Sequence, residues 1–312
     1  MSRADGPTGF LVVDKPPGMT SHDVVDRVRR LFRTKRVGHT GTLDPDATGI
    51  LVLCLGAATR IAEYLTASSK HYSAEFVFGA RTDTMDGSGA TIEERDASGL
   101  TAEDVAGLLP AFRGRIEQIP PMVSARKHAG QRLYALARDG ITVERESRPV
   151  TISQLEMTSF QSGPRATATL EVTCSSGTYI RVLADDLGAT AGTGAYMSAL
   201  RRTWVGEDEP TGFRLADAHA LEELESMASV GAADRALLSL ADGLRGMEKL
   251  QIDDGAACRL CMGQPAQIDL PAHGGATSPT GDLAAALCGA TVVAIVRRTG
   301  DVLRPVKVLA SR

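Results

Sequence analysis

Residues 38–51, GHTGTLDPDATGIL, combine one histidine, two aspartates and three threonines, with Leu43 as the only large apolar side chain before Ile50. Asp44 precedes a proline, which favours an extended or turn backbone, and the small residues around it leave its carboxylate uncovered at a loop tip. A structural aspartate in a turn is the commonest interpretation of such a motif. The competing interpretations both make Asp44 a nucleophile.

One of these interpretations is a phosphatase. Asp44, Asp46 and Thr48 match the letters of a D-x-D-x-T motif, in which the first aspartate is phosphorylated, the second is a general acid and Mg²⁺ neutralises the phosphoryl oxygens. In haloacid-dehalogenase-like enzymes this motif directly follows an apolar strand, whereas GHTGTL precedes it here. Asp185 and Asp186 could supply later metal ligands, although LADDLG is typical of the end of an amphipathic helix.

Composition sets limits on the kind of protein. A length of 312 residues with 43% apolar content predicts two domains with packed cores. A net charge of -4 and a pI near 5.9 mean that any nucleic-acid site must be a local basic patch. No stretch approaches the length of a membrane helix and the N-terminus lacks the pattern of a leader, so we expect a cytoplasmic protein without membrane contact.

The five cysteines include Cys258 and Cys261 in a CRLC pair that could suggest zinc. A closed zinc site needs four ligands, and no second pair or His-x-His cluster follows. We therefore expect no metal site, with the pair packed in a helix or turn. Cys54, Cys174 and Cys288 lie singly in apolar or alternating segments, which is typical of reduced thiols.

The elements around the loop can be predicted from local patterns. Residues 10–13 (FLVV) predict a strand that ends at the prolines of DKPPG. Thr20 or Ser21 then begins a helix with apolar residues at helical spacing. A basic cluster begins on the other face of this helix and continues up to Gly38. Its members are Arg27, Arg29, Arg30, Arg33, Lys35 and Arg36. Such a run is ordinarily a solvated face, and its position beside the loop favours a functional one.

The rest of the chain mixes strand and helix patterns. Apolar or alternating runs predict strands at residues 50–55, 72–78, 150–160, 165–174 and 196–205. Helices are predicted at residues 57–65, 101–112, 131–139, 179–187 and along 215–244. The last part contains a loop at 272–280 and strand patterns at 291–298 and 302–309. This pattern predicts an α+β fold with a mixed sheet and a small β-rich terminal domain.

Several motifs occur together in one order: VDKPPGMTSHDVV, RVGHTGTLDPDATG, KHYSAEFVFGARTDTMD, QIPPMVSARKHAGQRLY and CSSGTYIRVLADDLG. In order and spacing they resemble the motifs of the TruB-type tRNA pseudouridine synthases. The resemblance implies a largely antiparallel catalytic sheet domain with flanking helices over residues 9–247, and a PUA-like RNA-binding domain over 248–312. It implies isomerisation of uridine 55 in the TΨC stem-loop of tRNA, without a cofactor. We also expect a monomer.

The resemblance assigns the chemistry to three residues. Asp44 matches the family's essential aspartate, which attacks either the sugar or the base. Arg181, in GTYIR, matches the cation that holds this carboxylate ionised and aimed, as a guanidinium can do with two hydrogen bonds. Tyr72, in KHYSAEF, matches the aromatic residue that packs on the target uracil, and its hydroxyl is a candidate for proton relay.

The resemblance also implies a set of binding residues. Tyr179 and Leu200 match pocket positions, and His39 matches the residue that fills the space left by the extruded base. Contacts with RNA phosphates are expected from Lys15, Arg29, Arg30, Arg33 and Arg36. Arg297, Arg298, Arg304 and Lys307 give the terminal domain basic character for the acceptor stem. A noncatalytic tRNA-binding or chaperone protein stays an alternative.

Overall fold

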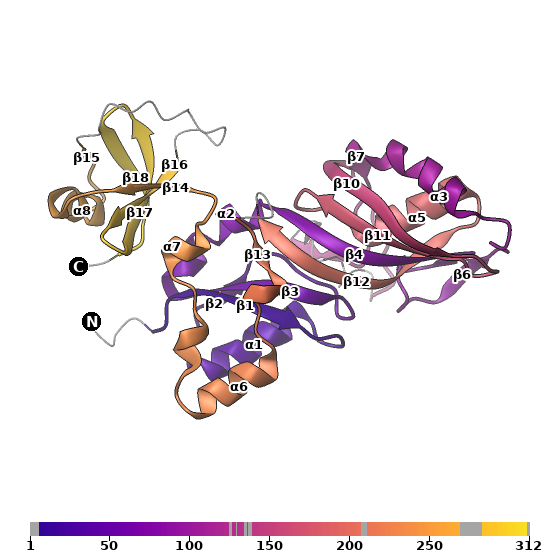
Figure 1. Ribbon diagram of the computed structural model, residues 1–312, viewed down its shortest axis with the longest axis horizontal. Helices are drawn as coiled ribbons and strands as arrows, with labels where there is room; N and C mark the ends of the chain where they lie inside the picture. The colour runs from indigo at the N-terminus through magenta and orange to yellow at the C-terminus, as the bar shows by residue number, and fades with distance from the viewer. Residues whose placement is uncertain are drawn as a thin grey trace.

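The computed structural model describes residues 6–124, 127–128, 130–133, 136, 139–206, 211–268 and 283–310. Two sheets dominate it, a nine-stranded one that carries the loop of Asp44 and a five-stranded one near the C-terminus. Figure 1 shows the five-stranded sheet with α8 at one end of the molecule and α3 and α5 at the other. The predicted α+β class with a β-rich C-terminal part is therefore confirmed.

The nine-stranded sheet has the order β1-β3-β12-β4-β11-β10-β7, with β13 on β12 and β2 on β3. Every pair is antiparallel except β12 with β3. Its strands are β1 (Gly9–Lys15), β2 (Val37–His39), β3 (Thr48–Leu55), β4 (Ser69–Phe78), β7 (Gly114–Gln118), β10 (Arg148–Gln161), β11 (Thr167–Cys174), β12 (Ala195–Gly206) and β13 (Phe213–Arg214). Short hairpins add β5 (Ala80–Thr82) with β6 (Thr91–Glu94), and β8 (Lys127–His128) with β9 (Gln131–Arg132).

Helices cover this sheet at two places. Helix α1 (Ser21–Leu31) begins with a capping box between Thr20 and Asp23, and its buried valines pack on the apolar residues of β1 and β3. Helix α5 (Ile180–Ala191) packs its apolar residues on β4 and β12. The remaining helical segments are short: η1 (Gly56–Arg60), α2 (Ala62–Thr66), α3 (Ala102–Leu108), η2 (Leu109–Phe112), η3 (Leu215–Asp217), α6 (Leu221–Ser229), η4 (Ala233–Ala236) and α7 (Leu240–Gly243).

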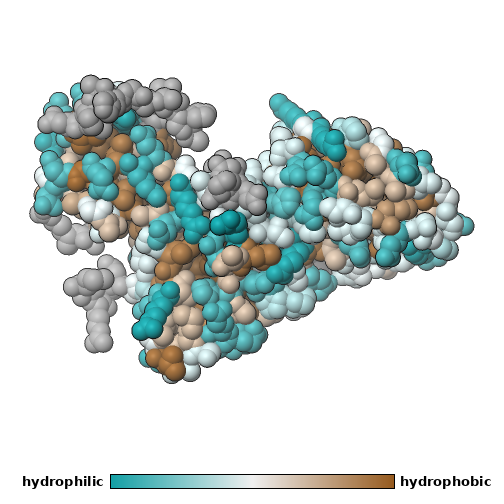
Figure 2. All heavy atoms as spheres, viewed as in Figure 1, coloured by the Kyte–Doolittle hydropathy of each residue, from teal (hydrophilic) through white to brown (hydrophobic). Residues whose placement is uncertain are grey.

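The C-terminal sheet has the order β14-β16-β17-β18-β15 and is covered by α8 (Asp254–Cys261). Its strands are β14 (Glu248–Gln251), β15 (Ala266–Gln267), β16 (Leu283–Cys288), β17 (Thr291–Thr299) and β18 (Val302–Val308). Ala285 and Ile295 join the same apolar cluster as Phe10 and Val52 of the large sheet, so the two sheets share buried surface. Hydrophilic side chains cover much of the visible surface of both parts (Figure 2). The expected boundary at residues 247 and 248 stays a prediction.

Most predicted elements are present, with differences in detail. The helix expected at 57–65 is a 3₁₀ turn followed by α2, and the one expected at 215–244 is four short segments. The helix expected at 131–139 and the loop expected at 272–280 fall wholly or partly outside the described residues. Among the described helices, none has the length and apolar character needed to span a bilayer.

Candidate active site

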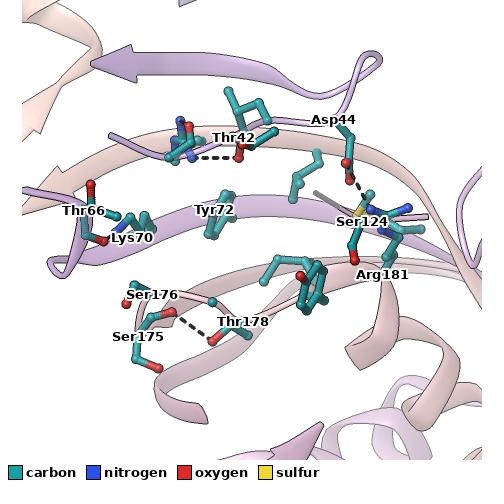
Figure 3. A pocket seen from close by; sticks show the side chains of 18 of the residues that line it. Thr42, Asp44, Thr66, Lys70, Tyr72, Ser124, Ser175, Ser176, Thr178 and Arg181 are labelled. Atoms are coloured by element: carbon teal, nitrogen blue, oxygen red, sulfur yellow. Dashed lines mark hydrogen bonds and ion pairs between the residues drawn. The ribbon is translucent and has the colours of Figure 1, made fainter. Parts of the chain in front are cut away.

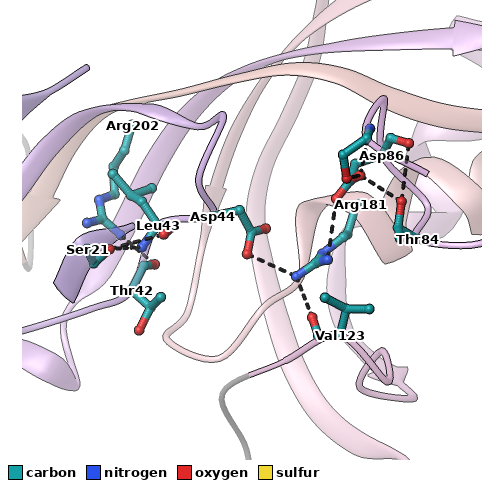
Figure 4. A network of polar contacts seen from close by, with 10 residues as sticks. Ser21, Thr42, Leu43, Asp44, Thr84, Asp86, Val123, Arg181 and Arg202 are labelled. Atoms are coloured by element: carbon teal, nitrogen blue, oxygen red, sulfur yellow. Dashed lines mark hydrogen bonds and ion pairs between the residues drawn. The ribbon is translucent and has the colours of Figure 1, made fainter. Parts of the chain in front are cut away.

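The loop that carries Asp44 connects β2 to β3 and is held at its centre by helix α1. Ser21, the first residue of the helix, is buried, and its hydroxyl accepts from Leu43 N at 2.8 Å and donates to Leu43 O at 3.0 Å. At its start, Thr40 N donates to Val52 O at 3.1 Å. The loop is therefore fixed at two points before the position from which Asp44 projects (Figure 4).

Lys15 occupies a different place from the one expected of a phosphate contact. Its side chain is fully buried at the end of β1, and Nζ donates to the carbonyl oxygens of Pro16, Met19 and Pro45 at 2.6–2.8 Å. An ammonium group has three donors, so these bonds use all of them. Lys15 therefore holds the backbone next to Asp44. The expectation that it contacts an RNA phosphate is wrong, because its three donors are already used. Burial lowers the pKa of Lys15 to about 8, against the attraction of the Asp46 and Asp44 carboxylates.

Arg181 and Asp44 meet across 137 residues of sequence. Tyr179 is the N-cap of α5, so Arg181 lies in its first turn, and its side chain is only 4% exposed. Nη2 donates to Asp44 Oδ1 at 3.0 Å and to the carbonyl oxygen of Val123 at 2.9 Å (Figure 4). The geometry brings together the two residues that the resemblance paired. A buried guanidinium next to a carboxylate favours its ionised form.

Asp86 is a second carboxylate on the same arginine and has no role in the sequence-based prediction. Its Oδ2 lies 3.4 Å from Arg181 Nη1, while its Oδ1 accepts from the Thr84 and Ser88 hydroxyls at 2.7 and 2.6 Å. The turn that carries it includes Met85 with a positive φ of 63°. The motif RTDTMD could have indicated the role of Asp86, because polar residues in a turn commonly orient one carboxylate.

The charge balance at Asp44 is set by these neighbours. Burial raises the pKa of the Asp44 carboxyl, and the Arg181 guanidinium is the largest opposing influence. The Asp86 and Asp46 carboxylates raise this pKa further, while Lys15 lowers it. Since 36% of the Asp44 side chain is exposed, one side of the carboxylate stays open to a ligand.

A cavity of about 350 Å³ lies beside this pair. Figure 3 shows Asp44 and Arg181 at one end, Thr66 and Lys70 at the other, and Tyr72 of β4 between them. Tyr179 and Leu200 also line it, so five of the predicted site residues share this cavity: Asp44, Tyr72, Tyr179, Arg181 and Leu200. Tyr72 is 8% exposed, and burial raises the pKa of its hydroxyl while Arg202 opposes the rise.

Tyr179 is held in place by a residue that the sequence analysis did not single out. The buried side chain of Gln118 donates to Tyr179 O at 3.3 Å and accepts from Tyr179 N at 3.0 Å. This two-point contact fixes the loop before α5 and thus the start of the helix that carries Arg181. His39 ends β2, one residue before Thr40, which lines the cavity.

The basic cluster that begins on α1 separates into two groups. Arg29 is half-buried, with Nη1 2.8 Å from Asp26 and Nη2 bonded to Val37 O at 3.2 Å. Arg27 also has a partner within the protein, because its Nε lies 2.5 Å from Glu225 Oε1. Within the described ranges, no hydrogen bond or ion pair engages the exposed side chains that remain: Arg30, Arg33, Lys35 and Arg36. These four are the better phosphate contacts.

The phosphatase alternative finds little support. Asp185 is bonded through both oxygens to Arg81, at 2.7 and 2.9 Å, so it pairs with β5 and not with the Asp44 loop. In the described part of the chain, no group of three His, Cys, Asp or Glu side chains is arranged to hold a metal ion. Cys258 and Cys261 lie in α8, half-buried, as expected for helix packing.

Two family models match most of the chain. One described as TruB family pseudouridylate synthase (N terminal domain) matches residues 29–180, and one described as tRNA pseudouridylate synthase B C-terminal domain matches 181–250. A tRNA pseudouridine synthase B from Symbiobacterium thermophilum is 50% identical over 255 residues, which cover 82% of each chain. Another, from Pelotomaculum thermopropionicum, is 47% identical over 234 residues, which cover 74% of this chain and 72% of the relative.

The fold comparison reaches over the C-terminal sheet as well. A chain in the structure described as "Crystal Structure of a Cbf5-Nop10-Gar1 Complex" superposes with a TM-score of 0.71 at 25% identity, over 98% of this chain and 86% of that chain. The sequence identity to the curated relatives over most of the chain, with Asp44 and Arg181 joined in one cavity, decides the classification. The chain belongs to the TruB family of tRNA pseudouridine synthases, which are isomerases.

Proposed function

We propose that this enzyme isomerises uridine 55 in the TΨC stem-loop of tRNA, with Asp44 as the nucleophile and the target base extruded from its stack. The observation that carries the proposal is the 3.0 Å contact between Asp44 and Arg181 at one end of a cavity walled by Tyr72. A carboxylate that is partly buried, paired with a cation and open on one side is suited to nucleophilic attack.

The reaction is an isomerisation, so its atoms balance within the nucleotide. The bond from the sugar C1′ to the uracil N1 breaks, a bond from C1′ to C5 forms, the C5 proton leaves and N1 gains a proton. Asp44 supplies the nucleophile, and Arg181 holds it ionised. We assign stacking on the base to the ring of Tyr72 and proton relay to its hydroxyl.

The position of the proposed nucleophile supports extrusion of the base. Asp44 sits at the end of a cavity, whereas a uridine in a folded stem-loop is stacked, so the base must leave the stack to reach it. We assign His39, next to the cavity-lining Thr40, to the space that the base leaves. Arg30, Arg33 and Arg36 would position the RNA backbone without reading its sequence. The C-terminal sheet, of PUA type, would contact the acceptor stem through Arg297, Arg298 and Arg304, whereas Lys307 is held by Glu63 at 2.5 Å and by Arg60 O at 2.7 Å.

The proposal is tested with an unmodified tRNA transcript labelled with tritium at uracil C5. We expect release of one tritium per tRNA, and no release from a transcript with cytidine at position 55. Release should be unchanged in EDTA, because the proposed chemistry uses no metal. Release from the transcript with cytidine at position 55 would show that the enzyme modifies another uridine, and abolished release in EDTA would favour metal-dependent chemistry.

The extrusion step has its own test. His39→Ala should slow release from folded tRNA at limiting substrate, since nothing would then fill the gap. An equal rate for both proteins would remove His39 from this role. The expected monomeric state and cytoplasmic location stay predictions.

A further inference from the structure

Among the described residues, Arg202 is the largest fully buried side chain, and it lies where three strands of the main sheet meet. On β12 it is paired with Tyr72 of β4 on one side and with Gly49 of β3 on the other. Gly49 has a φ of +96°, and a Cβ there would lie 2.1 Å from Arg202 O. The backbone at this position is therefore packed directly against the strand that follows the Asp44 loop.

The side chain of Arg202 reaches from this junction to both ends of the loop. Nε donates to Ile50 O at 2.7 Å, after the loop, and Nη2 donates to Gly41 O at 3.0 Å, before it. Nη1 lies 3.5 Å from Thr42 O. The planar fork of a guanidinium suits this role, because its donors point in fixed directions to separate acceptors. Figure 4 shows Arg202 beside Thr42 and Leu43, at the start of the stretch that leads to Asp44.

Burial of this cation needs an explanation. Among the described residues, no carboxylate forms an ion pair with Arg202, so its charge is met by carbonyl oxygens. A buried charge without a counterion is costly, and an apolar residue of similar volume would often stabilise the fold as well or better. Arg202 also lines the cavity, and its charge acts on the neighbouring Tyr72 hydroxyl. Its position thus connects the loop of the nucleophile with the tyrosine that supports the base.

We propose that Arg202 is a positioning residue for the isomerisation: it holds the Asp44 loop in register with Tyr72, so that the nucleophile and the stacked uracil meet at the right distance. This inference rests on the proposed role of Asp44. A displacement of about 1 Å in such a pair can cost on the order of 100-fold in rate. The proposed tRNA backbone contacts lie elsewhere, so binding should be nearly independent of Arg202.

The test is a single-turnover measurement with enzyme in excess over C5-tritiated tRNA. Arg202→Met keeps an unbranched stem as far as the position of Nε and removes the donors, and we expect the rate constant to fall by about 100-fold. Arg202→Lys keeps the charge but cannot bridge Ile50 and Gly41, so its rate constant should lie between those of Arg202→Met and the wild type. The affinity for tRNA should change by less than about threefold in both. Arg201→Met, which removes a partly exposed arginine paired with Asp14, is the matched control and should react like the wild type.

The readout separates positioning from folding. With enzyme in excess, tRNA sets the amplitude, so a variant that is merely unstable reaches the wild-type rate constant once its folded fraction saturates the tRNA, whereas a mispositioned loop lowers that limiting rate constant. Guanidinium or methylguanidinium at millimolar concentration should partly restore the rate constant of Arg202→Ala. An unchanged rate constant in Arg202→Lys and in whatever fraction of Arg202→Met is folded would overturn the proposal. If the wild type released no tritium at all, the proposed function would fail instead.

Discussion

Arg181 Nη1 lies 3.4 Å from Asp86 Oδ2, so the arginine that faces the nucleophile is shared between two carboxylates. Asp86 raises the pKa of Asp44 through its own charge, while it also orients the arginine that lowers it. The two effects have opposite signs at Asp44, and they can be separated by the dependence of the reaction on pH.

Asp86→Asn should move the acid limb of the reaction to lower pH. The carboxylate form of Asp44 is the nucleophile, so activity falls as pH decreases through its pKa. Removing the Asp86 charge lowers that pKa, although a less firmly held Arg181 should also reduce the plateau rate. The acid limb is measured as the dependence of the single-turnover rate constant on pH. At subsaturating enzyme this dependence reports the pKa of the group in the free enzyme. A limb that moves to higher pH would mean that the effect through Arg181 dominates.

Lys15→Met should weaken the fold and leave RNA binding intact. Three carbonyl oxygens would have no donor, and we expect the free energy of unfolding to fall by about 1–3 kcal/mol. The slope of log affinity for tRNA against log salt should stay the same. Denaturant unfolding and binding at several salt concentrations provide the two measurements. A decrease of the slope by about 0.7–0.9 would restore Lys15 as a phosphate contact.

Arg30, Arg33 and Arg36 should carry part of the salt dependence of binding. Replacing two of them by Ala should weaken tRNA binding and reduce the slope by about 0.7–0.9 for each RNA phosphate that is no longer neutralised. Arg27→Ala is the matched control, since this arginine is already paired with Glu225. If weaker binding came with an unchanged slope, the substitutions would be disturbing α1, and the basic run would be a solvated helix face.

Two substitutions at Tyr72 separate stacking from proton transfer. Tyr72→Phe keeps the ring, so tRNA affinity should hold while the rate falls by about 10²-fold or more if the hydroxyl relays the proton. Tyr72→Leu removes the ring and should cost a further 1–3 kcal/mol, roughly, in binding of the extruded base. Affinity and single-turnover rate are measured for each. Equal rates for Tyr72→Phe and the wild type would leave Tyr72 with stacking alone.

Local patterns were sufficient for the elements around the site. Thr20, one of the two residues expected to begin α1, is its N-cap, and Thr101 with Asp104 marks the start of α3 as predicted. The alternation of residues 72–78 also indicated the buried face of β4, since one residue in two of an alternating strand packs inward. These signals need no tertiary contact, which explains why they could be read from the chain.

Contacts between distant residues could not be read in the same way. Lys15 meets Pro45 across 30 residues, and Asp86 meets Arg181 across 95. A lysine beside a glycine-rich loop has the same local pattern whether its ammonium faces RNA or three backbone carbonyls. Arg181 and Tyr72 were identified through the resemblance to a family, and Arg202 and Gln118 were missed because their partners are backbone atoms of other elements.

The central claim is that the Asp44 carboxylate is the nucleophile, and Asp44→Asn tests it most directly. Asn keeps the size of the side chain and removes its charge, so tRNA carrying tritium at uracil C5 should bind with wild-type affinity and release no tritium. Asp46→Asn, which changes an exposed residue two positions away, should release tritium at the wild-type rate. Release by Asp44→Asn at a rate near that of the wild type would contradict the account.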